Sequence, residues 1–188
     1  TVTFSDIRVY EAGTRAANVN VPDSSKEVQF GQSIGTLPVP TREGYTFLGW
    51  YDESDNKVVD NQTVNYTSNV YLKSKWTLSN DALVKDNVVI DFGTPVNINP
   101  FANDKLKNTT FLGISTDGTN YSKAELNSTY GKFTVNGETV TYKPTKALNG
   151  VDTIYYHASV ADENGTTNIK SEITVVPASN VLYEETFF

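Results

Sequence analysis

The sequence predicts a mainly β protein, in which a small aromatic sheet is followed by an antiparallel β-sandwich. In the first half, residues Tyr45 to Trp50 alternate in the period-two manner of a strand after a turn at Gly44. In the second half, short β-branched and aromatic runs are bounded by Gly, Pro, Asn and Asp, the residues that favour turns. Only Ser122 to Tyr130 offers a helical alternative.

Two aromatic runs justify the first sheet. Pro40 fixes one backbone dihedral ahead of the first run, and Gly44 allows the tight turn that starts it. A second run, from Val70 to Trp76, would pair with the first and close a small sheet. Because Trp50 and Trp76 end these two runs, we expect both indoles in the core of the first domain.

The first half resembles the Listeria-Bacteroides repeat, also called the internalin B-repeat. The matching positions are Gly31-Gln32, Leu37-Pro38, Pro40 to Tyr51 and Val70 to Trp76. Thr1 to Phe4 would be the family's first strand, with Ser5 to Ser25 inserted before the Gly-Gln turn. The resemblance implies a compact β-grasp-like module over residues 1–79, of a kind found in tandem on bacterial surface proteins and not known for catalysis.

Asn136-Gly137 in the second half is a two-residue hairpin signal, because both central positions of a type I′ turn need a positive φ. Six runs of residues predict the strands of this half. The runs are Asn87–Phe92, Pro95–Asn99, Gly131–Val135, Thr139–Lys143, Asp152–Val160 and Ile169–Val176.

The second half resembles bacterial cadherin-like and immunoglobulin-like modules of surface proteins. The motifs that carry the resemblance are Gly93 to Ile98, Ala102-Asn103-Asp104, Val140 to Pro144, Gly150 to Tyr156 and Asp162 to Gly165. It implies an antiparallel immunoglobulin/cadherin-like β-sandwich over residues 80–177. Residues 178–188 are expected to form an exit segment towards a further module.

Composition limits the partners. The 188 residues carry 22 acidic and 15 basic side chains, and the formal charge of −7 repels nucleic acid and anionic lipid. No cysteine is present, which is typical of surface proteins of Gram-positive bacteria. No apolar run is long enough to insert into a membrane, and we expect the export signal and anchor to lie elsewhere in a longer protein.

Catalytic groups are sparse. His157 is the only histidine, and strand alternation places it with Thr153 and Tyr155 on the wetter face of its strand, so we expect a surface histidine and no Ser-His-Asp triad. Glycoside hydrolysis needs two facing carboxylates, whereas Asp52-Glu53 and Glu184-Glu185 are adjacent in sequence and point to opposite sides if they lie in strands. The sequence therefore predicts a protein that is not an enzyme.

Two binding hypotheses remain open. The first-domain aromatics either form the core or provide a sugar-stacking platform; they are Tyr45, Trp50, Tyr51, Tyr66, Tyr71 and Trp76. Acidic turns of the second half supply hard oxygen ligands, and cadherin-like modules can bind calcium, so Asp104, Asp152 and Asp162 are the leading calcium candidates. The competing interpretation makes these side chains turn formers and the protein free of cofactors. An intramolecular Lys-Asn isopeptide bond is a further alternative for immunoglobulin-like modules.

The sequence thus predicts a non-catalytic, extracellular module pair of a bacterial cell-surface protein, acting as a spacer or in attachment. Its expected partners are neighbouring modules of the same chain and a protein or glycan of the host or cell surface. The alternative is a carbohydrate-binding accessory module of a secreted glycan-degrading enzyme, which an exposed row of aromatic side chains would favour.

Overall fold

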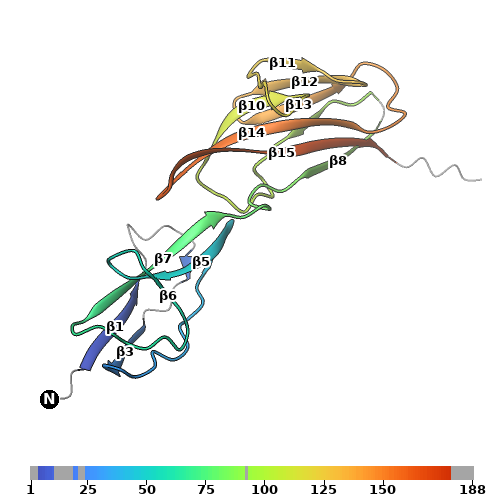
Figure 1. Cartoon of the computed structure of the whole chain (residues 1–188). Helices are drawn as coiled ribbons and strands as arrows, with labels where there is room; N and C mark the ends of the chain where they lie inside the picture. Colours follow the sequence, from blue (N-terminus) through green and yellow to red (C-terminus); the bar gives the residue numbers. More distant parts are fainter. Residues whose placement is uncertain (1–3, 11–18, 21–23, 92, 179–188) are drawn as a thin grey trace, which may run out of the picture. The chain divides into compact units, whose positions relative to one another are not determined.

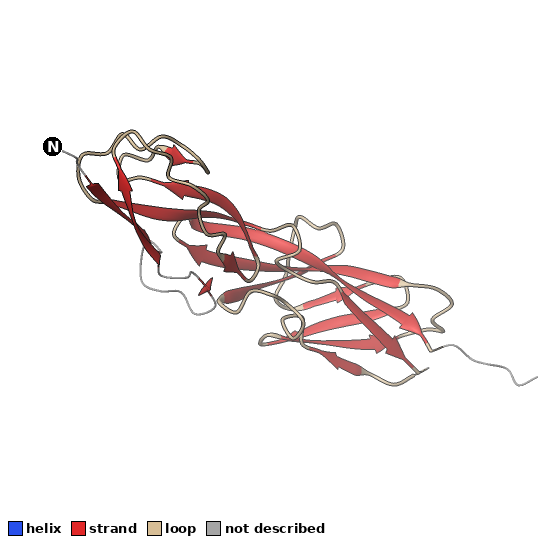
Figure 2. Cartoon of the chain, turned by 90° about the horizontal axis from the view of Figure 1, so that it is seen from below, coloured by secondary structure: helices blue, strands red, loops and turns tan. Residues whose placement is uncertain are grey.

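The computed structural model describes residues 4–10, 19–20, 24–91 and 93–178, and every regular element in them is a β-strand (Figures 1 and 2). The prediction of a mainly β protein is confirmed, and no membrane-spanning helix occurs in this part of the chain. The chain divides into two compact units, Thr1–Ala82 and Leu83–Phe188. Apart from Ala178, the predicted exit segment 178–188 lies outside the described residues, as do Glu184 and Glu185.

The first unit is built around a five-stranded sheet in the order β3-β1-β7-β5-β6, beside a two-stranded sheet of β2 and β4. β7 is central, lying parallel to β1 and antiparallel to β5 (Figure 1). The strands of this unit are β1 (Phe4–Tyr10), β2 (Val19–Asn20), β3 (Ser24–Gln29), β4 (Thr41–Arg42), β5 (Tyr45–Tyr51), β6 (Lys57–Val58) and β7 (Val70–Leu78).

Most local signals of the first half are found where the sequence placed them. Gly44 has φ 80° in the turn between β4 and β5, and Gly31, with φ 82°, lies in the turn after β3. The first strand is the exception: of the predicted strand from Thr1 to Phe4 only Phe4 is among the described residues, and the strand that the structure describes continues from Phe4 to Tyr10. Part of the predicted insertion after Phe4 is therefore β-strand. β1 pairs antiparallel with β3.

The core of the first unit lies against one face of its sheet. β7 alternates strictly, with Val70, Leu72, Ser74 and Trp76 buried and the intervening residues at least partly exposed. Residues from β3, β6 and the long connections complete the core, and they include Val28, Ile34, Val58 and Val64. The sheet therefore has one packed face and one face directed away from this core.

The second unit is a sandwich of two four-stranded sheets, in the orders β10-β14-β15-β8 and β11-β12-β13-β9 (Figure 1). All neighbouring strands are antiparallel except β8 and β15, which are parallel. The strands are β8 (Asp86–Ile90), β9 (Val96–Ile98), β10 (Thr109–Ser115), β11 (Glu125–Asn127), β12 (Gly131–Asn136), β13 (Thr139–Pro144), β14 (Asp152–Asp162) and β15 (Gly165–Pro177).

The two sheets bury alternate residues of their strands. Phe133 and Tyr142 face inward from one sheet, with ring centroids 4.6 Å apart, and Ile154, Tyr156 and Ile173 face inward from the other. All five are fully buried. The predicted sandwich is confirmed, and its six predicted strands are all present.

Two local predictions of the second half are wrong, and one strand has no counterpart among the predicted runs. The helical alternative at Ser122–Tyr130 is instead the short strand β11 with its flanking loops. No predicted run corresponds to β10, a seven-residue edge strand of the sheet β10-β14-β15-β8. The β12–β13 turn is one residue later than expected, because Asn136 pairs with Thr139 and only Gly137 of the two loop residues has a positive φ.

Candidate functional site

The two tryptophans of the first unit are core residues, as predicted. Trp50 and Trp76 are 2% and 3% exposed, and Phe47 packs between them with centroid separations of 5.4 and 5.3 Å. The Trp50 Nε1–H donates to the Pro38 carbonyl at 2.7 Å, and the Trp76 Nε1–H donates to Ser74 Oγ at 3.0 Å. Both indoles are therefore enclosed by protein and offer no stacking surface for a ligand.

The four tyrosines of the aromatic set behave differently, because all are half-buried. The Arg42 guanidinium lies 3.7 Å from the ring centroid of Tyr45, and the Lys75 ammonium lies 4.3 Å from that of Tyr51. Tyr66 Oη donates to Asp52 Oδ2 at 3.4 Å. The aromatic set therefore divides into two buried indoles, which form core, and four half-buried tyrosines, which lie at the surface of the unit.

Asp52 anchors the connection between β5 and β6. Its Oδ1 accepts hydrogen bonds from the backbone amides of Ser54 and Asn56 at 3.0 and 2.8 Å, which closes a turn containing Asp55 at φ 66°. This turn returns the chain antiparallel to β5, so that Lys57 on β6 comes to lie opposite Tyr51. Asp52 has a structural role here, and its neighbour Glu53 is exposed.

The first calcium candidate, Asp104, is buried in the sandwich beside β14. Its carboxylate accepts a hydrogen bond from Tyr156 Oη at 2.9 Å and another from the backbone N–H of Val84. Burial raises the pKa of Asp104, against the two hydrogen bonds and the charge of Lys107, which lower it. Asp104 thus ties the first segment of this unit to a core tyrosine.

The second candidate, Asp152, is buried at the start of β14. It accepts hydrogen bonds from Ser128 Oγ at 2.6 Å, from Tyr142 Oη at 2.9 Å and from the amides of Thr129 and Tyr130 at 3.1 Å. The bond to Asp152 and burial raise the pKa of Tyr142 well above its ordinary value, burial being the larger cause. Asp152 therefore holds the turn before β12 against the sandwich core.

The third candidate, Asp162, lies at the far end of β14 in the turn to β15, where it accepts a 2.8 Å hydrogen bond from the Asn164 amide. Asp152 and Asp162 are separated by the length of this 11-residue strand, roughly 33 Å at about 3.3 Å per residue. The structure therefore does not bring the three candidates together. In the part of the chain that it describes, no group of three or more His, Cys, Asp or Glu side chains is arranged to hold a metal ion.

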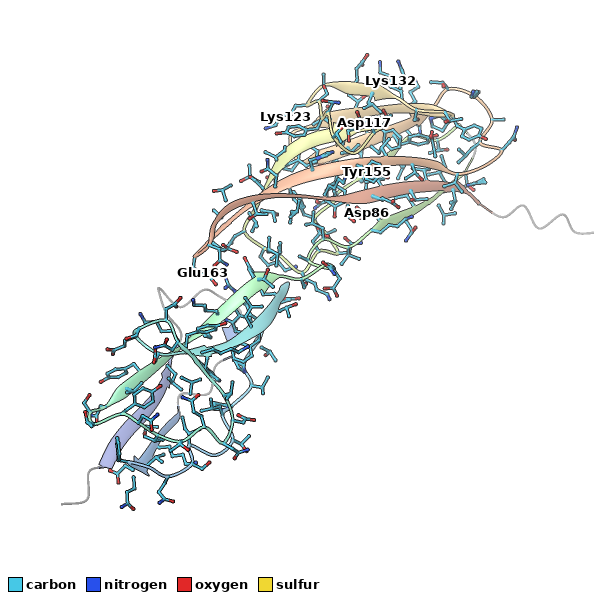
Figure 3. The ribbon with its side chains drawn as sticks, in the orientation of Figure 1. Asp86, Asp117, Lys123, Lys132, Tyr155 and Glu163 are labelled. Carbon is cyan, nitrogen blue, oxygen red and sulfur yellow. The ribbon has the colours of Figure 1, made fainter. Side chains whose placement is uncertain are left out.

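One buried acid was not among the leading candidates. Asp86, at the start of β8, is 8% exposed, and its Oδ2 has no hydrogen-bond partner (Figure 3). Burial and the neighbouring Asp104 carboxylate raise the pKa of Asp86 to about 7. Sequence alone gives no signal for this pair, because Asp86 and Asp104 approach each other only through the folding of the loop after β9.

The prediction that His157 lies on a wet surface is wrong, because its exposure is only 7%. The connection after β10 covers it: the Tyr121 ring packs against the His157 ring with centroids 5.0 Å apart and a tilt of 34°, and Ser115 Oγ lies 2.7 Å from His157 Nε2. Burial and the charge of Lys170 lower the pKa of His157, against the smaller opposing influence of Asp117.

The Ser115–His157 pair is not a catalytic dyad in this geometry. Ser115 is fully buried, so its hydroxyl cannot reach a substrate. The carboxylate of Asp117 accepts hydrogen bonds from Thr119 and Asn120 and makes none with His157, which leaves the pair without the third member of a triad. The pair instead fixes the loop after β10, because Ser115 Oγ also accepts from the Gly118 amide at 3.1 Å.

Comparison with known families gives two matches. Residues 1–75 match the Listeria-Bacteroides repeat domain, and residues 79–176 match the bacterial immunoglobulin (Ig) domain. Both resemblances read from the sequence motifs are confirmed. Both modules are non-catalytic and typical of bacterial cell-surface and secreted proteins. No curated protein and no solved structure matches the chain.

Proposed function

The chain belongs to the bacterial Ig domain family and carries a Listeria-Bacteroides repeat domain ahead of its Ig domain, and from this premise we propose that it is a structural module pair of a cell-surface protein. Its role is that of a spacer, which holds a distal region of the same protein away from the cell wall. The absence of cysteine supports a Gram-positive source.

The observation that carries this proposal is how both units use their functional groups. The indoles of the first unit pack inside it, and the buried acids Asp104 and Asp152 of the second bind its own tyrosines. Such contacts stabilise a module without serving a ligand, since buried polar groups need partners and these have them within the fold. The buried indoles also argue against the sugar-stacking accessory module that was the alternative.

The spacer role is tested in the full-length protein on living cells. Removing residues 1–177 should leave the protein on the surface but make its distal region less accessible to an antibody on intact cells. Replacing the two units by an unrelated Ig pair of equal length should restore accessibility, because a spacer needs only length and stability. If only the original pair restores it, the units have a specific binding role and the spacer proposal fails.

A further inference from the structure

Three lysines gather on the open face of the first unit's sheet. Lys57 on β6 and Lys73 on β7 are the register partners of Tyr51 on β5, one on each side, and Lys75 is the register partner of Gly49. We call this surface, Lys57, Lys73 and Lys75 around Gly49 and Tyr51, the lysine face. Cross-strand partners lie about 5 Å apart, so the three side chains emerge as neighbours from adjoining strands.

The lysine face is directed away from the core because strand side chains alternate. The same register pairs Trp50 with Val58 and with Ser74, and all three of these side chains are buried on the opposite face. Lys57 is exposed, and Lys73 and Lys75 are partly exposed.

Two of the lysines are held in place. A Cβ atom at Gly49 would come within 2.6 Å of Lys57 Cε and 3.2 Å of Lys57 Nζ, so the lysine stem lies directly on the glycine, whose φ of 136° favours the absence of a side chain. Lys75 Nζ lies over the Tyr51 ring and pairs with Asp55, an acid whose side chain is 72% exposed. Lysines that are already ordered lose less conformational entropy when they bind a partner.

The charge of the lysine face is opposite to that of the whole chain, which is −7. An extended anionic surface such as a membrane or a nucleic-acid duplex would bring many negative charges close to the rest of the protein and be repelled. A thin anionic chain contacts the face alone. Lysine is a point charge without the fork geometry of arginine, which suits separate carboxylate, phosphate or sulfate groups along a polymer.

We propose that the lysine face binds an acidic polysaccharide through the ammonium groups of Lys57, Lys73 and Lys75. The half-buried ring of Tyr51 lies among them and holds the Lys75 ammonium 4.3 Å from its centroid, so its role is to position a charge for the polymer. This surface is separate from the buried indoles, and it gives the spacer a weak attachment of its own. The proposal depends on the proposed function only for the cell-surface setting, so binding by the purified chain can fail while the spacer role stands.

The test measures binding of dextran sulfate and polygalacturonate to the purified chain by isothermal titration calorimetry at low salt. We expect the K57Q/K73Q/K75Q variant to lose at least about tenfold in affinity for both, because it removes all three positive charges that face the polymer, and a factor of ten corresponds to about 1.4 kcal/mol. The control is K123Q/K143Q/K146Q, which removes the same charge from exposed lysines of the second unit and should bind within about twofold of the unaltered chain. Figure 3 labels the first of these, Lys123. Blue-shifted tryptophan emission shows in each variant that the first unit is folded.

Two further substitutions test the geometry of the face. Asp55→Asn removes the acid that pairs with Lys75 and should tighten binding about twofold to threefold, whereas Gly49→Ala displaces the Lys57 stem and should weaken it. Neutral dextran and phosphatidylserine vesicles should not bind. The proposal is overturned if both triple variants lose affinity equally, if the unaltered chain binds neither anionic polysaccharide, or if inorganic polyphosphate or the vesicles bind as tightly as the polysaccharides.

Discussion

The two units are stabilised by different kinds of interaction. The first has one principal sheet, and it fills the single covered face with large aromatic groups, in which Phe47 contacts both Trp50 and Trp76. The second closes two sheets on each other and adds buried carboxylates, Asp104 and Asp152, that fasten loops to core tyrosines. A one-sheet unit therefore depends on few large side chains and keeps an open face, whereas the sandwich depends on hydrogen-bond networks.

The difference predicts where each unit fails. Loss of one aromatic side chain should damage the first unit broadly, because its small core has few substitutes. Among the described residues, the second unit has the larger set of buried hydrophobic side chains, and its sensitive positions are the acids whose removal leaves buried donors without acceptors.

The largest effect is expected for Trp50→Ala and Trp76→Ala. Each should lower the free energy of unfolding of the first unit by about 3 to 5 kcal/mol, because a fully buried indole leaves a large cavity. Urea titration followed by tryptophan fluorescence measures this. Emission of the unaltered chain should be blue-shifted and weakly quenched by iodide, and Val39→Ala, at a site 77% exposed, is the control with almost no effect. Freely quenched, red-shifted emission would show that the indoles are exposed.

The next effect concerns Asp86 and is pH-dependent. Its folded pKa of about 7 lies above the unfolded value near 3.8, so between these values the folded state binds a proton that the unfolded state has released. Asp86 therefore favours folding least above pH 7, and its own contribution to the stability of the second unit should rise as the pH falls from 7 towards 4. His157, whose pKa is lowered, contributes in the opposite direction, so the Asp86 contribution is read from the difference between the unaltered chain and a variant at this position.

Asp86→Asn should remove this pH dependence and be more stable than the unaltered chain at pH 8, by on the order of 4 kcal/mol at most, from about 1.4 kcal/mol per pKa unit. Urea unfolding at pH 4.5, 6 and 8 measures it. If the substitution destabilises the second unit equally at every pH, the Asp86 carboxyl is not the cause of the pH dependence.

Asp152→Ala should lower the free energy of unfolding of the second unit, by slightly less than the maximum change expected for Asp86→Asn. It removes the acceptor of Tyr142 Oη, Ser128 Oγ and two amides, and leaving buried donors unpaired should cost about 3 kcal/mol in total. Asp162→Ala is the matched control, because that acid lies in an exposed turn and should cost less than about 1 kcal/mol. Equal effects of the two substitutions on the midpoint of thermal unfolding would contradict the assigned role.

The smallest effect is expected from calcium. Asp104, Asp152 and Asp162 lie apart, and their oxygens accept internal hydrogen bonds. The melting temperature of the chain should therefore be the same in millimolar calcium as in a chelator at matched ionic strength. Calcium that bound only the folded state would stabilise it by about 2.7 kcal/mol at 100 times its dissociation constant, and such a rise would reopen the calcium hypothesis.

How far the sequence predicts this structure depends on the range of the interactions involved. β12, β13, β14 and β15 follow from local patterning, since alternation and turn residues are properties of neighbouring positions. β10 is not recognised as a strand from the sequence, because Gly113 interrupts its apolar run. Glycine is needed at this position because a Cβ atom there would lie 2.5 Å from the backbone of Ser122.

The same long-range element explains the error at His157. Strand alternation gives its face correctly, but only the loop after β10, 36 or more residues earlier, turns that face into a buried site. The acids are similar, because sequence marks Asp104 as a turn residue and cannot show that it binds a tyrosine 52 positions away. Local rules therefore give strands and core indoles, while long-range contacts decide the polar sites.

The central claim, that two self-contained β units are joined in one chain, is tested most directly by separating them. Residues 1–79 and 80–177 should each unfold cooperatively in urea, with midpoints close to those of the corresponding transitions in the whole chain. Trp50→Ala should then affect only the first transition and Asp152→Ala only the second. If neither half folds alone, or if each substitution shifts a single common transition, the chain is one cooperative domain and the account is wrong.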